Sequence, residues 1–409
     1  MAESFIRLLH FADAHVGIET YGATDPETGL SSRVRDFFER LYEIRDYAVE
    51  HDADLVIFAG DTFKTRNPTP TLQREFARFV RDLARQCPVL LLVGNHDLPT
   101  AASRASSVEI YHTLDVPNTL VGFDYGLHRV ETKRGPVQIA TAPYPLRSRL
   151  LDERRTRGAT LEDIDRALQL ELEAILRELA QQADQDPAPR VLAGHFSVQG
   201  SAYGSERGVM IGRDIAVNLG VLANPAWDYV ALGHIHRRQS LPNDANVPVV
   251  YSGSIERIDF GEEGDPKGFC WVELARGAAA WRFVDLHARP FVTLRIDARA
   301  SADPTAEAIR QARGLDLTGA VVRVIVRLSE GNAALLHDSD LRRALANAGA
   351  NHVAAIQKDV ERSIHARLGG SPEKLTPGQL LKRYLEVRGT PPDQADKLLA
   401  AAREVFEEA

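Results

Sequence analysis

Short apolar runs alternate with longer amphipathic stretches in the first part of the chain, and this alternation predicts its secondary structure. Apolar residues recur at helical spacing over 33–50 and 71–86, which predicts two helices. The runs 7–11, 54–59 and 88–93 are mostly apolar on both faces, which predicts strands that are covered on both sides. Such alternation of strands and helices favours an α/β core with parallel strand pairing.

Three short strands are predicted next (NTLVGF, HRVET and PVQIATA), with little between them, in the manner of a meander. A long helix is expected over 160–183, because Thr160 and the aspartate three residues later form a capping-box pattern. Buried strands are predicted again at 190–195 and 229–234. We therefore expect one domain over 1–285, with two sheets or one mixed sheet and helices outside.

A shift in composition near 286–290 marks the start of a second predicted domain, 286–366. Its compact β-α-β-α-β pattern places strands at 291–297, 321–328 and 352–359 and helices at 303–313 and 338–349. The last segment, 367–409, begins with a Gly/Pro-rich linker and continues with two amphipathic helical stretches. These two helices either pack on their own domain or form a docking element.

Composition excludes several classes of protein. With 409 residues, of which 44% are hydrophobic and 26% charged, the chain is an ordinary globular protein. Its net charge of −8 does not indicate a strongly basic nucleic-acid binder, although a local basic groove is compatible with it. Two cysteines, Cys87 and Cys270, provide neither a disulfide framework nor a thiolate metal site. Because we find no signal peptide and no apolar window of ~18 residues, we expect a soluble cytoplasmic protein with no membrane segment.

Five predicted apolar strands end in residue types that bind metal ions. Sites in open α/β sheets form at the carboxyl ends of strands, so these five ends can converge on one point. Glycine stands directly before four of the five clusters and lets the backbone turn and approach closely. In chain order the clusters are Asp13 and His15; Asp61; Asn95, His96 and Asp97; His195; and His234 and His236.

The spacing and chemistry of these residues predict a metal centre. Residues i and i+2 of an extended segment point to the same side, so Asp13 and His15 can face one centre, as can His234 and His236. Carboxylate, imidazole and amide ligands without sulfur suit Mn²⁺, Fe²⁺ or Zn²⁺, and their number suits two ions. A single such histidine is usually a core or surface residue. Five clusters in order at the same structural place favour a shared site.

The order DAH, GDTF, GNHD, GHF and GHIH over 13–236 resembles the calcineurin-like metallophosphoesterase superfamily. That resemblance implies an α/β fold with a two-sheet β-sandwich flanked by helices, and a dinuclear metal centre. The segment YSGSIERIDFGEEGDPKGFCWVEL (251–274) resembles the SbcD-type nuclease subunits of DNA double-strand-break repair. The small second domain then resembles their DNA-contacting capping domain. The final helices resemble those that dock on an SbcC-type ABC ATPase.

The resemblance also implies a role for each residue. One ion would be held by Asp13, His15, Asp61 and His236, and the other by Asp61, Asn95, His195 and His234. His96 would not be a ligand; it would stabilise the transition state and help to protonate the leaving 3′-oxygen. Asp97 would orient the His96 ring. A water activated by the ions would be the nucleophile, so no Ser or Cys nucleophile is needed.

Basic loop residues are candidate DNA contacts. Many relatives have His or Asp after GDTF, where this chain has Lys64. Lys64 and Arg66 can donate charge-assisted hydrogen bonds to phosphate oxygens, and a solvated loop is the alternative for both. The loop 147–158 is also rich in arginine, and there we favour a solvated loop.

The leading hypothesis is a Mn²⁺-dependent DNA nuclease subunit, an exonuclease on double strands and an endonuclease on single strands, which works with an SbcC-like ATPase. The resemblance also implies a homodimer. One alternative is a stand-alone metallophosphoesterase acting on nucleotides or small phosphodiesters, which would have little use for a capping domain and an apolar helix pair. A non-catalytic scaffold is disfavoured, because no ligand position is replaced.

Overall fold

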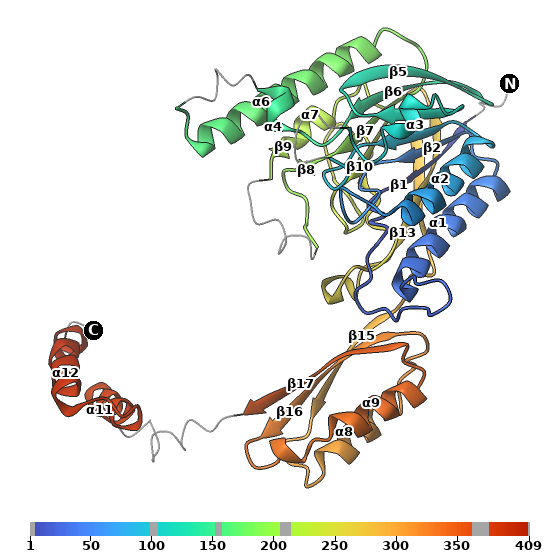
Figure 1. Cartoon of the computed structure of the whole chain (residues 1–409). Helices are drawn as coiled ribbons and strands as arrows, with labels where there is room; N and C mark the ends of the chain where they lie inside the picture. Colours follow the sequence, from blue (N-terminus) through green and yellow to red (C-terminus); the bar gives the residue numbers. More distant parts are fainter. Residues whose placement is uncertain (1–4, 99–104, 152–157, 205–213, 362–375, 408–409) are drawn as a thin grey trace. The chain divides into compact units, whose positions relative to one another are not determined.

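The structure is a computed structural model that describes residues 5–98, 105–151, 158–204, 214–361 and 376–407. It divides into two compact units, Met1–Val292 and Thr293–Ala409, and each is described by itself (Figure 1). Part of the arginine-rich loop (152–157) and most of the predicted linker (362–375) lie outside the described residues.

The first unit contains two six-stranded sheets. The first has the order β14-β13-β1-β2-β3-β4 and the second the order β11-β12-β10-β7-β6-β5. The strands of the first sheet are β1 (Ile6–Phe11), β2 (Leu55–Phe58), β3 (Val89–Leu92), β4 (Thr119–Gly122), β13 (Gly268–Ala275) and β14 (Ala278–Asp285). Those of the second are β5 (Gly126–Thr132), β6 (Gly135–Ala142), β7 (Arg190–His195), β10 (Tyr229–Gly233), β11 (Gln239–Ser240) and β12 (Val249–Tyr251).

Parallel pairing dominates the centre of each sheet, and antiparallel strands lie at the edges. β1, β2, β3 and β4 pair in parallel, while β13 and β14 add an antiparallel edge. In the second sheet β6, β7, β10 and β12 are parallel, with β5 and β11 antiparallel at the two edges. Because parallel strands share a direction, their carboxyl ends lie along one edge of each sheet.

The two sheets pack face to face, and helices cover their outer faces. Leu8 and Ile57 of the first sheet lie in one buried cluster with Val191 and Ala231 of the second. Leu9 alternates to the opposite face and packs with residues of α1 (Ser32–Glu50) and α2 (Pro70–Ala84), which lie side by side (Figure 1). The outer face of the second sheet packs on α6 (Leu161–Ala183) and α7 (Leu219–Leu222). The predicted α/β sandwich flanked by helices is therefore confirmed.

One local prediction is confirmed and another is wrong. The capping box of α6 is present, because the Thr160 side chain accepts from the Asp163 backbone N–H while the Asp163 carboxylate accepts from that of Thr160. The three short strands after residue 117 do not form a meander. β4 pairs in parallel with β3 in the first sheet, whereas β5 and β6 form a hairpin at the edge of the second. The chain therefore crosses between the sheets at this point.

The remaining elements among the described residues of the first unit are short. They are α3 (Ile110–Thr113), α4 (Arg147–Leu150), β8 (Ser197–Val198), β9 (Ala216–Val217) and the 3-10 turn η2 (Phe260–Glu262). Of these, β8 follows β7 directly, and η2 lies in the loop that joins β12 to β13. The η2 turn carries Glu262, which contacts the site described below.

The second unit holds a three-stranded sheet of order β15-β16-β17, in which β16 and β17 are parallel. The Leu341 and Leu345 side chains of α9 are buried. The elements are β15 (Phe291–Asp297), α8 (Pro304–Ala312), β16 (Val321–Ser329), η3 (Ala333–Leu335), α9 (Asp338–Asn347), β17 (His352–Glu361), α11 (Pro377–Val387) and α12 (Pro392–Glu407). Among the described residues, no helix has the length and apolar character needed to cross a membrane.

Candidate metal centre

The residues predicted to bind metal lie where five strands end. The ends of β1 and β2 are tied together, because the backbone N–H groups of Asp13 and His15 donate to the carbonyls of Gly60 and Asp61, each over 3.0 Å. The end of β10 joins them through the His234 N–H, which donates to the Asp13 carboxylate over 3.0 Å. The carboxyl ends of both sheets therefore meet at one place, as expected for an α/β site.

Asp61 lies between two groups of imidazoles. Its Oδ2 is 3.5 Å from His15 Nε2, and its Oδ1 is 3.4 Å from His195 Nε2. Three sets of side chains bring one ligand atom each to within 4.8 Å of one another, and two of these sets contain Asp61. The sets are Asp13, His15 and His236; His15, Asp61 and His96; and Asp13, Asp61 and His195.

Asn95 joins the side of the site opposite His15. Its Oδ1 lies 3.1 Å from His195 Nε2 and 3.0 Å from His234 Nδ1. On the other side His15 Nε2 is 3.0 Å from His236 Nε2. The structure thus brings all seven predicted ligands into two groups that meet at Asp61.

Burial shifts the protonation of these groups in opposite directions. Burial raises the pKa of Asp13 and lowers that of His15. Burial also opposes charge on His195, but the Asp61 and Asp13 carboxylates outweigh it and raise the pKa of His195 to about 9. Burial acts to raise the pKa of Asp61, but the imidazoles of His195 and His15 hold it well below its usual range. Since an imidazole must be deprotonated to bind metal, ion binding at His195 would release a proton.

The backbone of the site is held in an uncommon conformation. Asp13, His15, Asp61 and His234 all have positive φ, of 54°, 41°, 59° and 95° respectively. Such residues persist only where the surrounding structure fixes them, and they cluster at functional sites. Glycine is required beside Asp61: a Cβ at Gly94 would lie 2.2 Å from the Asp61 Oδ1 atom. The close backbone approach expected from the glycines is thus a direct contact with a predicted ligand.

His96 lies at the edge of the site and is partly exposed. Its backbone N–H donates to Asp61 Oδ1 over 2.8 Å, and its Nδ1 lies 3.0 Å from the Lys64 carbonyl oxygen. Its ring centroid is 4.7 Å from that of His15. The ring is therefore held beside the predicted ligands with Nε2 as its second polar atom.

Asp97 differs from the expectation. Instead of contacting the His96 ring, its carboxylate accepts from the backbone N–H groups of Asp61 (3.0 Å), Thr62 (3.1 Å) and Gly94 (3.0 Å), and from the Ser107 hydroxyl (3.1 Å). Asp97 is fully buried whereas His96 is partly exposed beside the predicted ligands, so neighbouring side chains of this loop have different surroundings. Asp97 therefore holds the loop that presents Asp61.

Two carboxylates that were not predicted lie behind the histidines. His234 Nε2 is 2.9 Å from Asp214 Oδ2, and His236 Nδ1 is 2.9 Å from Glu262 Oε1. When each outer N–H donates to its carboxylate, the opposite ring nitrogen is left as an acceptor that faces the site. His195 has the same arrangement, because its Nδ1 lies 2.7 Å from the Ala59 carbonyl oxygen.

The donor chemistry fits divalent metal ions. Three imidazoles have their outer nitrogen fixed by an oxygen acceptor, which is the arrangement of metal-ligating histidines in general. The acidic residues and Asn95 add oxygen donors at the same place, and no sulfur takes part. These residues would suit Mn²⁺, Fe²⁺ or Zn²⁺ with open positions for water or substrate.

The predicted DNA contacts lie on the surface. Lys64 and Arg66 are exposed in the loop after Phe63. In the loop 147–158, the described Arg149 donates to the Phe123 carbonyl over 2.7 Å, so this arginine is engaged within the fold.

Comparisons with known proteins give one family. Residues 6–238 match the calcineurin-like phosphoesterases. The SbcD chain of the nuclease SbcCD from Rhodobacter capsulatus is 30% identical over 310 residues, which cover 73% of this chain and 73% of that protein. The protein of the same name from Bacillus subtilis is 27% identical over 292 residues, covering 68% of this chain and 69% of that one. A solved dimetal phosphatase from Danio rerio is 12% identical with a TM-score of 0.39, and the match covers 68% of this chain and 98% of that one.

Proposed function

Because the chain belongs to the calcineurin-like phosphoesterase family, and within it to the SbcD-type nuclease subunits, we propose that it cuts DNA with two divalent metal ions. The chain is a metal-dependent phosphoester hydrolase by this membership. The observation that carries the two-ion proposal is the position of Asp61, whose two carboxylate oxygens face His15 and His195 separately. A carboxylate placed in this way can bridge two ions.

We assign the ligands as follows. One ion would be held by Asp13, His15, Asp61 and His236, and the other by Asp61, Asn95, His195 and His234. When bound, the ions supply Lewis acidity toward the phosphate and lower the pKa of a water nucleophile. The chain's own contribution is to hold these ligands in a fixed geometry, which the strained backbone and the buried acceptors behind the rings provide.

His96 is the proposed acid at the leaving group. With Nδ1–H donating to the Lys64 carbonyl, the ring is oriented and an added positive charge on it is stabilised. Its Nε2–H would then stabilise negative charge on the phosphate and pass a proton to the leaving 3′-oxygen. Asp97 acts on this chemistry indirectly, through the Asp61 loop.

Mn²⁺ is the proposed native ion, and DNA is the proposed substrate. We propose exonuclease action on double strands and endonuclease action on single strands, with the unit from Thr293 contributing DNA contacts as a capping domain. Lys64 and Arg66 are the candidate phosphate contacts beside the centre. Their exposure supports this assignment. Such work on DNA would take place in the cytoplasm.

An SbcC-type ABC ATPase is the proposed partner, since both relatives are named as components of the SbcCD nuclease. Helices α11 and α12 are the proposed docking segment, and two copies of the chain are proposed to pair. Tyr384 and Leu398 of these helices are 47% and 46% exposed, which leaves apolar surface for a partner. Tyr384→Asp should abolish co-elution with the ATPase, whereas the exposed control Glu386→Gln should keep it. Unchanged co-elution of Tyr384→Asp would contradict the docking proposal.

Cleavage assays test the proposed function. The purified chain, with and without its ATPase partner, is incubated with Mn²⁺ and end-labelled duplex DNA, and in parallel with bis-p-nitrophenyl phosphate. We expect cleavage of both substrates, and loss of both activities in His96→Ala. Hydrolysis of the small ester without DNA cleavage under any of these conditions would instead support a stand-alone phosphodiesterase.

A further inference from the structure

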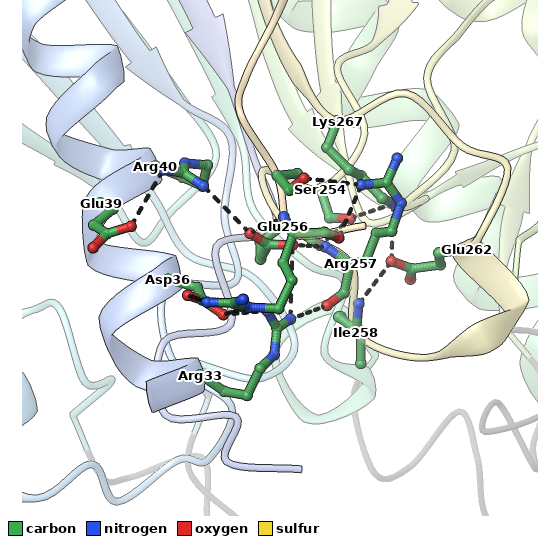
Figure 2. A network of polar contacts seen from close by, with 12 residues as sticks. Arg33, Asp36, Glu39, Arg40, Ser254, Glu256, Arg257, Ile258, Glu262 and Lys267 are labelled. Atoms are coloured by element: carbon green, nitrogen blue, oxygen red, sulfur yellow. Dashed lines mark hydrogen bonds and ion pairs between the residues drawn. The ribbon is translucent and has the colours of Figure 1, made fainter. Parts of the chain in front are cut away.

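A buried ion pair lies directly behind His236. Glu262 accepts from His236 Nδ1 over 2.9 Å, and its other oxygen accepts from the Ile258 backbone N–H over 3.0 Å and lies 2.9 Å from Lys267 Nζ. Lys267 also donates to the Ser254 hydroxyl over 2.8 Å and to the His236 backbone carbonyl over 3.3 Å. Lys267 thus contacts both the backbone of His236 and the Glu262 carboxylate that holds its ring. Figure 2 shows Lys267 beside Glu262 and Ser254.

The Glu262–Lys267 ion pair is more deeply buried than is expected of an ion pair that serves only to stabilise the fold. Glu262 is 0% exposed and Lys267 is 1% exposed. Removing two such charges from water costs several kcal/mol for each ion, and well-packed apolar residues often serve stability as well or better. What an apolar pair cannot do is accept the Nδ1–H of His236 and fix its ring. The geometry is therefore suited to placing one imidazole.

We propose that Glu262 and Lys267 are positioning residues for His236, which hold its Nε2 toward the ion shared with Asp13, His15 and Asp61. This inference rests on the proposed metal centre. Glu262 would fix the ring tautomer and its rotation, and Lys267 would fix Glu262. A carboxylate behind a ligating imidazole also raises its basicity, and loss of such a partner typically weakens metal binding about 10–100-fold.

The loop that carries Glu262 is fixed at a second point, away from the metal centre. Glu256 is fully buried and accepts from the backbone N–H groups of Arg257 (2.8 Å) and Arg289 (3.0 Å). Its oxygens lie 3.7 Å from Arg33 and 3.8 Å from Arg40, both on α1 (Figure 2). Because the loop is pinned to α1 there, Glu262 cannot readily follow a displaced ring, so His236 is held in place before an ion binds.

The test compares Mn²⁺ binding by Glu262→Gln, Lys267→Met and the double variant, with Glu273→Gln, an exposed glutamate on β13, as the matched control. Calorimetric titration should give two ions per chain for wild type. In Glu262→Gln one ion should bind about 10–100-fold more weakly, with the other unchanged. Lys267→Met should act in the same direction. Wild-type affinity for both ions in a folded Glu262→Gln would overturn the proposal.

The double variant removes both buried charges together, so it addresses the case in which a single variant fails to fold. The double variant should fold, and its affinity for the weakened ion should stay below that of wild type. A further measurement uses wild type alone: ¹⁵N-imidazole NMR of the metal-free protein should show His236 protonated at Nδ1 with Nε2 as the acceptor. The opposite tautomer would contradict the proposal whatever the variants do.

Metal binding and DNA cleavage separate the positioning role of Glu262 from the nuclease activity. If wild type binds two ions and Glu262→Gln loses one, but no DNA is cut, the positioning role stands and the nuclease proposal fails. If wild type cuts DNA and Glu262→Gln binds both ions as wild type does, the nuclease proposal stands and the positioning role fails.

Discussion

The Nε2 atoms of His15 and His236 lie 3.0 Å apart, although 221 positions separate the two residues in the chain. With its Nδ1–H donated to Glu262, neutral His236 presents an acceptor at Nε2. Such a nitrogen facing a second imidazole requires a proton or a cation between them. Asp13 and Asp61 add carboxylates at the same point, so a divalent cation would meet its ligands without a rearrangement of the backbone.

Metal ions should therefore stabilise the fold. An ion that binds the native state alone, present at 100 times its Kd, adds about 2.7 kcal/mol to the free energy of unfolding. We expect Mn²⁺ to raise the melting temperature of wild type and EDTA to reverse the effect. His15→Ala should lose much of the increase, whereas His112→Ala, an exposed histidine outside the site, should keep it. An equal increase in both variants would contradict the assignment of His15.

His96→Ala should separate binding from chemistry. The His96 ring is held by the Lys64 carbonyl and is not among the proposed ligands, so both ions should bind with unchanged affinity. Cleavage should fall by about 10²–10⁴-fold, as expected when a general acid is lost. Calorimetry with Mn²⁺ and DNA cleavage rates on the same preparation provide the two measurements. Cleavage at the wild-type rate would show that His96 is not the acid.

Asp97→Asn should destabilise the protein. The Asp97 carboxylate now accepts hydrogen bonds from buried backbone N–H groups, and the introduced amide would turn an N–H₂ group toward some of them. A buried donor left without an acceptor costs about 1–3 kcal/mol. Urea denaturation in EDTA should show a loss of about this size. The exposed control Asp244→Asn should stay within about 0.5 kcal/mol of wild type. Equal stability of the two variants would remove Asp97 from the support of the Asp61 loop.

The sequence predicted the site best where ligand-type residues recurred at the carboxyl ends of predicted parallel strands. The ends of apolar parallel strands fall on one edge of a sheet, so Asp61 and Asn95 could be placed together without a structure. The partners behind the rings could not be. Asp214 reaches His234 across 20 positions and Glu262 reaches His236 across 26, and no periodicity relates such pairs. Their positions depend on how loops fold back on the strand ends.

Asp97 shows a different limit. The family resemblance implied that Asp97 orients the ring of its neighbour His96. In the structure the Asp97 carboxylate is buried away from the His96 ring, because the backbone N–H groups of Asp61 and Gly94 need an acceptor inside the fold. The strand β4 likewise shows what the sequence pattern could not predict. Its pattern predicted a strand but not which of the two sheets it joins.

His10 should make stability depend on pH. Its ring is buried between the sheets against Tyr229 and the Leu232 carbonyl, and burial lowers the pKa of His10 from 6.5 to about 3 although the hydrogen bond to Leu232 acts to raise it. Between pH 6.5 and about pH 3, His10 is therefore protonated in the unfolded chain but neutral in the native chain. The contribution of His10 is fully present above pH 6.5 and is lost as the pH falls toward 3.

His10→Gln keeps a donor for the Leu232 carbonyl but does not titrate in this range. Urea denaturation in EDTA between pH 6 and pH 4 should show a steeper loss of stability in wild type than in His10→Gln. The difference in slope should approach about 1.4 kcal/mol per pH unit, which corresponds to one proton. Parallel pH profiles would mean that His10 is charged in the folded protein.

Electron paramagnetic resonance of the Mn²⁺-loaded protein would show whether two ions share the Asp61 carboxylate. Ions about 3.5–4 Å apart are close enough for their spins to couple. We predict two Mn²⁺ per chain with the spectrum of an exchange-coupled pair. One Mn²⁺ per chain at saturation, or two with uncoupled spectra, would contradict a centre bridged by Asp61.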